Sequence, residues 1–360
     1  MKNKNLISLF LAIPFFVMSQ NNDKAQPQVS MLLFVDTYYI YDFNNAQTDY
    51  RQDFLFNHNR HNETNLNLGL LKLAVEQEKY RVNLGLQVGT YAIDNYSAEN
   101  ETARLIHEAN VGIALDENEK IWLDAGILPS HIGFESAISI NNPSLTRSLA
   151  AENSPYFLTG FRLSYKINEH WDFAALLVNG WQRIQKVKGN SIPSGGTQLN
   201  YHKNDFSFNW STFVGSEFPN EERKMRYFND FFVTQKFGEL SLTAGFDIGW
   251  QQIEKNSKHY DYWYTPTLIG HYQFTSEFAT ALRFEYYNDE NGVIINPSQN
   301  GFNTFGTSLN FDYQPFSNLY LRTEARYFKG NDDYFNAKEN FQDDDFFIGF
   351  SLAYKFTKEF

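Results

Sequence analysis

Apolar and polar residues alternate along most of the chain. In KYRVNLGLQVGTYAI (79–93), Tyr, Val and Leu alternate with Arg81, Asn and Gly. The segment LSLTAGFDIGWQQ (240–252) repeats the pattern, with the large apolar residues on one side only. Alternation with a period of two over ten or more residues indicates a long β-strand whose faces meet different environments. Helical spacing is nearly absent, so the pattern predicts an all-β chain.

Short and long polar connections alternate between the predicted strands. The seven short connections are predicted at 76–79, 116–120, 167–171, 203–205, 237–240, 275–278 and 315–319. The eight long connections are predicted at 43–62, 94–103, 128–155, 183–197, 216–225, 254–260, 288–301 and 329–344. They join 16 strands, and one missed or invented hairpin would make 14 or 18. An even count with both termini on the short-turn side is the rule for bacterial outer-membrane barrels.

A soluble β-sandwich alternates in the same way, so the period alone does not identify the environment. Three features favour a membrane: the strand length, the regular exchange of short and long connections, and a polar face rich in glycine and charge. In hydrocarbon every backbone polar group must be paired within the protein, so a sheet must close on itself. We therefore predict a transmembrane antiparallel up-and-down β-barrel of about 16 strands, with a lumen too wide for side chains to fill.

The composition narrows the possible functions. The chain has 360 residues, of which 18% are aromatic, yet its mean hydropathy is negative. After residue 20 no apolar run approaches the length of a transmembrane helix. The absence of cysteine excludes disulfides and thiolate zinc sites. The net charge of −12 argues against nucleic acid as a partner, because phosphate binding needs a basic surface.

The N-terminus resembles a cleaved secretory signal peptide. Two lysines precede an apolar run at 6–18, and the small Ser19 stands at the predicted cleavage point. The run is too short to span a bilayer comfortably, although an uncleaved anchor is the alternative. We expect export with loss of residues 1–19, and a single barrel domain at 20–360 in the outer membrane.

Four predicted short turns share a local pattern. They read YKINEHW, YQFTSEF, YQPFSNL and, at the end of the chain, YKFTKEF. In each, a Tyr closes one strand and an apolar residue stands where the next would open. Tyr and Trp at these positions would form an aromatic girdle at the level of the lipid headgroups. The last copy stops at Phe360.

With these features the sequence resembles the OmpL-like β-barrel porins of Gram-negative outer membranes. The similarity is carried by FVDTYYIYDFN (34–44), NSPYFLTG (153–160), LLVNGW (176–181) and Phe360. It spans essentially the whole mature chain and implies an outer-membrane barrel with pore activity. It carries no catalytic residues to transfer. Phe360 resembles the terminal aromatic residue by which the barrel-assembly machinery recognises its clients.

Charged residues on the predicted inward faces are the best candidates for function. A charge facing lipid near the midplane would cost about 2–4 kcal/mol, which constrains the facing. The candidate pore-lining residues are Arg81, Glu108, Asp124, Arg162, Lys166, Arg283, Glu285, Arg322, Glu324 and Arg326. Opposed arginines and carboxylates set a transverse field that selects solutes by charge. The alternative, that they only solvate and brace the wall, is least favoured for the cluster at 322–326.

The third long connection, 129–156, is the longest. Within it Asn142 is a candidate N-cap, Pro143 suits the first helical position, and good helix formers follow. In porins generally the third loop folds into the barrel and narrows it, whereas an ordinary extracellular loop is the alternative. The charged residues that would line such a constriction are Glu135, Arg147 and Glu152.

Signals for other chemistry are weak. His58 and His61 are three residues apart, but no carboxylate or fixed helix completes a metal site. QDDDFF (342–347) lacks the glycine of a calcium loop. No metal or cofactor is therefore expected.

We expect a non-enzymatic porin, embedded in outer-membrane lipid, that passes small hydrophilic solutes; a homotrimer is compatible with its exposed aromatic bands. The alternatives are a lipase-like barrel enzyme, although no Ser and His pair stands out, and a surface-binding protein with a closed lumen.

Overall fold

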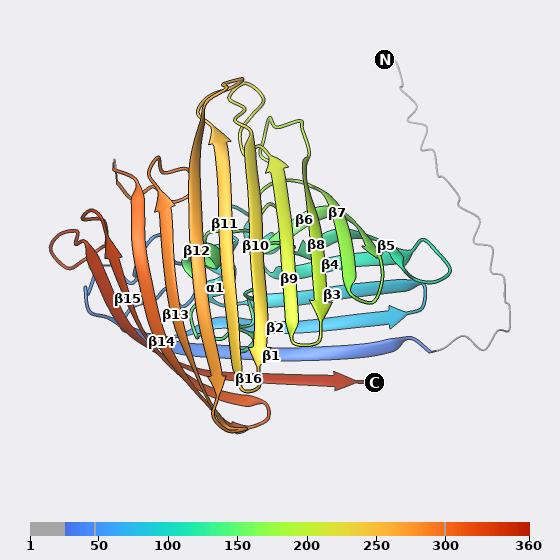
Figure 1. Cartoon of the computed structure of the whole chain (residues 1–360), viewed down its shortest axis with the longest axis horizontal. Coiled ribbons are helices and arrows are strands. Elements are labelled where there is room, and N and C mark those ends of the chain that lie inside the picture. The colour runs from blue at the N-terminus through green and yellow to red at the C-terminus, as the bar shows by residue number, and fades with distance from the viewer. Residues whose placement is uncertain (1–25, 47, 299) are drawn as a thin grey trace, which may run out of the picture.

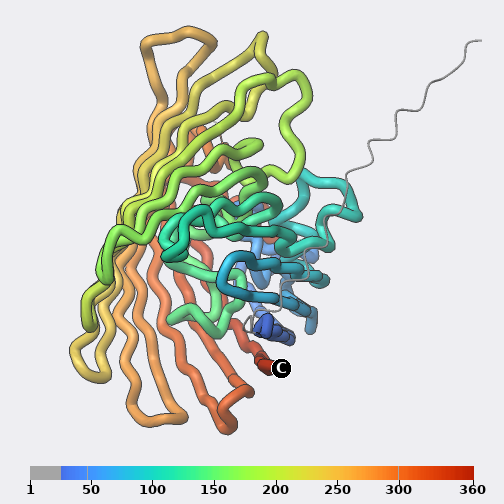
Figure 2. Tube along the Cα trace, turned by 90° about the vertical axis from the view of Figure 1, so that its right-hand side faces the viewer, coloured from blue at the N-terminus to red at the C-terminus, as the bar shows by residue number. Residues whose placement is uncertain are grey.

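The structure, a computed structural model, is a closed antiparallel barrel of 16 strands (Figure 1). The described residues are 26–46, 48–298 and 300–360. Strand β1 (Gln28–Asp42) pairs with β16 (Asp344–Glu359) and closes the sheet. Both views place these two strands side by side (Figure 1 and Figure 2). The predicted signal peptide lies outside the described residues.

Every consecutive pair of strands forms an antiparallel hairpin. The strands between β1 and β16 are β2 (Thr64–Gln77), β3 (Tyr80–Val88), β4 (Ile106–Ala114), β5 (Ile121–Pro129), β6 (Phe157–Lys166), β7 (Trp171–Val178), β8 (Ser194–Lys203), β9 (Phe206–Gly215), β10 (Arg226–Phe237), β11 (Leu240–Gln252), β12 (Tyr260–Gln273), β13 (Phe278–Asp289), β14 (Phe302–Phe316) and β15 (Leu319–Gly330). The prediction of an all-β barrel with 16 strands is confirmed.

Helices occur only in the long loops of the described chain. They are α1 (Thr90–Asn95), α2 (Glu101–Arg104), the 3-10 turn η1 (Ser139–Asn141) and α3 (Leu149–Glu152). None of the helices in the described ranges is long and apolar enough to cross a bilayer. The prediction that the second long loop starts at 94 is wrong, because Gly89, at φ +112°, ends β3 and α1 follows it.

Alternate residues of each strand face out of and into the barrel. On β13, Leu282 and Phe284 are 44% and 43% exposed on the outer face, whereas Arg283 and Glu285 are 0% and 2% exposed on the inner face. An apolar outer face suits hydrocarbon, and ring closure pairs the backbone groups that an open sheet would leave free. The predicted facing of the strands therefore agrees with the structure.

The wall of the barrel is uneven. Strands β3 to β9, which we call the short wall, have 8 to 10 residues each. Strands β10 to β16, the long wall, have 12 to 16. The third loop, residues 130–156, leaves the short wall after β5 and returns to it at β6. It can therefore reach across the barrel towards the long wall.

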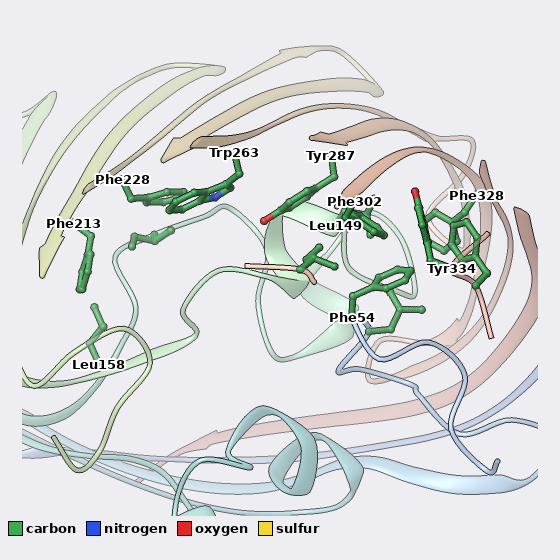
Figure 3. Packing of buried hydrophobic residues seen from close by; sticks show 14 of the residues in the cluster. Phe54, Leu149, Leu158, Phe213, Phe228, Trp263, Tyr287, Phe302, Phe328 and Tyr334 are labelled. Atoms are coloured by element: carbon green, nitrogen blue, oxygen red, sulfur yellow. The ribbon is translucent and has the colours of Figure 1, made fainter. Parts of the chain in front are cut away.

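The long-loop half of the barrel interior contains a packed aromatic cluster (Figure 3). Its wall residues, each at most 2% exposed, are Phe213, Phe228, Trp263, Tyr287, Phe302 and Phe328. Phe54 of the first long loop, Leu149 of the third and Tyr334 of the last pack against them. Sixteen strands leave too wide a lumen for wall side chains alone to fill, and here the loops supply the remaining apolar surface.

Candidate functional site

The third loop is hydrogen-bonded to the inner wall of the long side. Arg322 of β15 is 3% exposed, and Asp312 of β14 fixes its guanidinium with bonds of 2.8 and 2.9 Å. The same guanidinium donates to four loop carbonyls over 2.6 to 3.3 Å, those of Ser139, Asn142, Pro143 and Ser144. One wall side chain therefore fixes the course of six loop residues.

A network of four buried charges lies beside Arg322. Arg283 contacts Glu285 at 3.2 Å and Glu324 at 2.8 Å, and Arg326 contacts Glu285 at 2.7 Å. All four side chains are fully buried. Removing charges from water is costly unless their remaining hydrogen-bonding groups are satisfied. The loop backbone satisfies most of them here, and Nε of Arg283 contacts Glu285 without forming a hydrogen bond.

The loop backbone supplies both donors and acceptors to this network. Glu324 accepts from the Thr146 N–H at 2.6 Å, and Glu285 accepts from the Leu149 N–H at 2.6 Å. Arg283 donates to the Thr146 carbonyl at 2.7 Å, and Arg326 donates to that of Arg147 at 2.9 Å. The five predicted pore-lining residues of β13 and β15 thus face inward, but the third loop covers them.

The predicted helix from Asn142 is wrong. The loop has an extended residue at Asn142, and its only α-helix, α3, begins at Leu149 with Ser148 as the N-cap. The Ser148 side chain accepts from the Ala151 N–H, the usual capping bond. Between residues 142 and 147 the wall binds the backbone groups that a helix would use internally, so the long wall overrides the local helix propensity.

The three predicted constriction residues hold the loop to itself and to its neighbours. Glu135 accepts from the Ser148 N–H at 3.0 Å and from its hydroxyl. Burial raises the pKa of Glu135, while nearby Arg283 opposes the shift. Glu152 accepts from the Phe56 N–H at 2.7 Å, which joins the third loop to the first.

Arg147 lies between loops. Its guanidinium carbon is 3.1 Å from the centroid of the Tyr156 ring, and it donates to the Asn95 side chain at 2.9 Å. Asn95 ends α1 in the second loop, so Arg147 joins the second and third loops. Arg147, like Glu135 and Glu152, is at most 9% exposed.

The predicted residues of the short wall have a different environment. Arg81 of β3 bonds Asp124 of β5 through Nε at 2.7 Å and Nη2 at 2.6 Å, and Arg162 of β6 bonds it at 3.3 Å. The two arginine side chains are 26% and 28% exposed. Glu108 is buried and paired with Lys72, and Lys166 is exposed on the inner face near the short turns.

Several inward residues of this site were missed by the sequence analysis. Lys72, Asp312 and Asp36 lie on the inner face, and Asp36 accepts from His58, Ser139 and Ser351. The signal was available, because each of these residues stands in the alternate row of its strand that faces the lumen. Loop partners such as Ser139 carry no such signal.

The two histidines of the first loop serve separate contacts. His58 bonds Asp36 at 2.9 Å, and the His61 ring accepts from the Asp42 N–H at 3.1 Å. Among the residues that the structure describes, no three His, Cys, Asp or Glu side chains are grouped as metal ligands. These contacts tie the first loop to β1.

Two polar hollows border the third loop. On the short-turn side a hollow of 320 Å³ is lined by Asn141, Lys236, His271, Asp312 and Gln314, among others. On the long-loop side a hollow of 210 Å³ is lined by Asp94, Asn95, Glu152, Trp181 and Arg183, among others. The loop therefore lies between the two ends of the barrel interior, where a small change in its position would alter the width of any path.

Comparison with known proteins agrees with this architecture. The family model described as "Putative beta-barrel porin-2, OmpL-like" matches residues 28–356. The chain belongs to this porin family. Family membership and the closed barrel together identify an outer-membrane channel protein. No curated protein is detectably similar in sequence.

Solved porin structures are similar to this porin in fold. The anion-selective porin from Comamonas acidovorans has a TM-score of 0.64 at 9% identity, covering 92% of this chain and all of that one. The trimer form of OmpT from Vibrio cholerae has a TM-score of 0.62 at 8% identity, over 92% and 100%. The channel DcaP of Acinetobacter baumannii has a TM-score of 0.60 at 12% identity, over 92% and 97%. At such identities the likeness shows the fold alone.

Proposed function

We propose that this porin lets small hydrophilic solutes diffuse passively through the barrel and that the third loop sets the width of their path. The observation that carries the proposal is the position of this loop, which is bonded across the interior and borders a polar hollow on either side. A constriction held by a rigid hydrogen-bonded network selects solutes by size and charge without any energy input.

The predicted site residues divide into two roles under this proposal. Those of the long wall, Arg283, Glu285, Arg322, Glu324 and Arg326, hold the loop in place. On the short wall, Arg81, Arg162 and Lys166 face the solutes. The buried Asp124 pairs with both arginines, and Glu108 fixes Lys72 beside them. Exposure supports the division, because the long-wall residues are at most 3% exposed whereas Arg81 and Arg162 are about a quarter exposed.

A liposome swelling experiment tests the proposal. Purified protein is incorporated into liposomes that are then diluted into isotonic solutions of neutral sugars of increasing size. We expect swelling rates that fall steeply with sugar size. Equal, protein-independent rates for every sugar would overturn the proposal.

A surface-binding protein with a closed lumen is the second candidate. The aromatic cluster favours it, because Phe54, Phe302 and Tyr334 pack against one another inside the long-loop half of the barrel. If this candidate is right, liposomes that contain correctly folded protein should not swell in any of the sugar solutions. A lipase activity has no comparable support, so we propose that the protein is not an enzyme.

The route to the membrane and the assembly are further proposals. We propose that residues 1–19 are removed during export, which mass spectrometry of the mature protein would show directly. We also propose that the barrel-assembly machinery inserts the protein and that it forms a homotrimer, as the trimer form of one similar porin suggests. Analytical ultracentrifugation in detergent measures the number of chains.

A further inference from the structure

The short wall carries a charged cluster that the third loop leaves partly open. It consists of Arg81, Asp124 and Arg162, on β3, β5 and β6. Asp124 is 1% exposed, whereas the two arginine side chains are 26% and 28% exposed. The carboxylate is therefore buried beneath two guanidinium groups that both reach the lumen.

Two arginines and one aspartate give the cluster a net charge of +1. Asp124 uses Nε and Nη2 of both arginines, and Nη1 of each makes no hydrogen bond with a residue in the described ranges. A guanidinium has five N–H donors in a fixed fork, so each arginine keeps three for another acceptor. Such forks suit the paired oxygens of carboxylates and phosphates.

The surrounding residues are shaped for this cluster. Gly112 of β4 lies between Arg81 and Asp124, and a Cβ there would stand 2.3 Å from the Asp124 carboxylate and 2.9 Å from the Arg81 side chain. The Trp122 ring supports the Arg81 guanidinium at 4.4 Å. The arginines are thus held in one arrangement, which lowers the entropy that a ligand would have to fix.

Other charges near the cluster do not neutralise it. Glu76, the cross-strand neighbour of Arg81, is exposed and forms no ion pair with any described residue. Lys166 lies on the same face of β6 as Arg162, and its neighbour Asp172 faces the His202 ring at 3.7 Å. Exposed charges such as these are screened by water and salt, whereas the buried pairing with Asp124 is not.

We propose that Arg81 and Arg162 form a binding site for small oxyanions, of the phosphate and carboxylate class, on the solute path of this porin. The site rests on the proposed function, because an anion must enter the barrel to reach it. An anion bound there would be held by charge-assisted hydrogen bonds from two guanidinium groups. Weak binding of this kind concentrates anions in the lumen while still letting them leave.

Inorganic phosphate is the probe for the test. Its binding to folded protein in detergent is measured by calorimetry, for the wild type and for three variants. The variant R81Q/D124N/R162Q removes all three charges and leaves no buried carboxylate unpaired. D124N frees both guanidinium groups. The control K203Q removes an exposed charge at a short turn.

We expect saturable phosphate binding to the wild type that weakens at least about tenfold in R81Q/D124N/R162Q, because hydrogen bonds to charged groups are lost. D124N should bind at least as tightly as the wild type, and K203Q should bind equally. Absence of saturable binding to folded wild-type protein, or equal binding by the triple variant, would overturn the proposal.

Ion currents in planar bilayers separate this inference from the proposed function. Conducting wild-type protein that binds no phosphate would disprove the oxyanion site and leave the porin function standing. Folded protein that binds phosphate but never conducts would disprove the porin function and leave the site standing.

Discussion

Arg322 fixes more of the third loop than any single contact of the loop with itself. A glutamine at this position would reach one or two of the four carbonyls and would leave Asp312 without its cation. Truncating one partner of a buried charge pair costs about 2–5 kcal/mol. The loop should then occupy several positions instead of one.

We therefore predict that Arg322→Gln raises the mean single-channel conductance and speeds limited proteolysis within residues 130–156. Lys203→Gln is the control, since Lys203 is an exposed cation at a short turn and is not among the residues proposed to hold the loop or to face the solutes. Unchanged conductance and proteolysis in Arg322→Gln would show that the loop does not depend on this anchor.

Glu135 gives the loop a dependence on pH. Burial raises its pKa above the ordinary value of 4.5, against the opposing charge of Arg283, and Glu285 is the like charge that faces it. The folded loop therefore binds the proton more tightly than the unfolded loop does. The stability of the loop must rise as the pH falls from above the raised pKa towards 4.5.

Wild-type protein should accordingly resist loop proteolysis better at pH 5 than at pH 7. Glu135→Gln keeps the size of the side chain and cannot ionise, so it should show a smaller difference between the two pH values. An equal difference in the variant would assign the pH effect to other groups.

At the scale of single elements, the strands were predictable and the loops only in part. Period-two alternation is a local property that each strand carries in its own residues, which is why β11 and β13 were correctly assigned. Residues 90–93 break that alternation, because Tyr91 and Ile93 fall on the row of Arg81 and Asn83. They form α1, since Gly89 turns the chain and Tyr91 packs inside the barrel. The helix predicted from Asn142 in the third loop was wrong, since the conformation of this loop depends on wall side chains more than 130 residues away.

The same limit applies to the candidate site. The alternation along the strands placed ten charged residues on the inner face. It could not show that the third loop covers the long wall and leaves the short wall partly open. That distinction depends on where the third loop lies, which only the assembled barrel determines.

Two glycines opposite each other on β5 and β6 let these strands lie close to their other neighbours, β4 and β7. Gly126 and Gly160 have φ of +131° and +156°, and a Cβ on either would lie 2.1 Å from a backbone oxygen. We predict that Gly126→Ala destabilises the barrel by about 1–3 kcal/mol, the usual cost of strained backbone. The temperature of the heat-induced band shift on detergent gels measures this loss.

Gly270→Ala on β12 is the control for this prediction. A Cβ at Gly270 would meet only the end of the Leu242 side chain, at 3.4 Å. Its transition temperature should match that of the wild type. A Gly126→Ala protein as stable as Gly270→Ala would contradict this account of the close approach of β5 to β4.

For the whole molecule, Phe360 should matter for assembly and little for the finished pore. It follows the last residue of β16, is 67% exposed, and contributes one backbone bond of 2.9 Å to Val29 across the closing seam. Deleting Phe360 should lower the amount of folded protein in the outer membrane and leave the conductance of the assembled fraction unchanged. Phe360→Tyr, which keeps a terminal aromatic ring, should assemble normally, and equal yields from the deletion and the wild type would refute an assembly signal.

The central claim is that the barrel conducts although loops and aromatic side chains narrow its interior. The direct measurement is the current across a planar bilayer after addition of purified protein whose barrel is shown to be folded by its heat-dependent gel shift. The account predicts discrete, reproducible conductance steps. Consistent absence of steps from protein that shows the shift would contradict it and would favour the closed, surface-binding barrel.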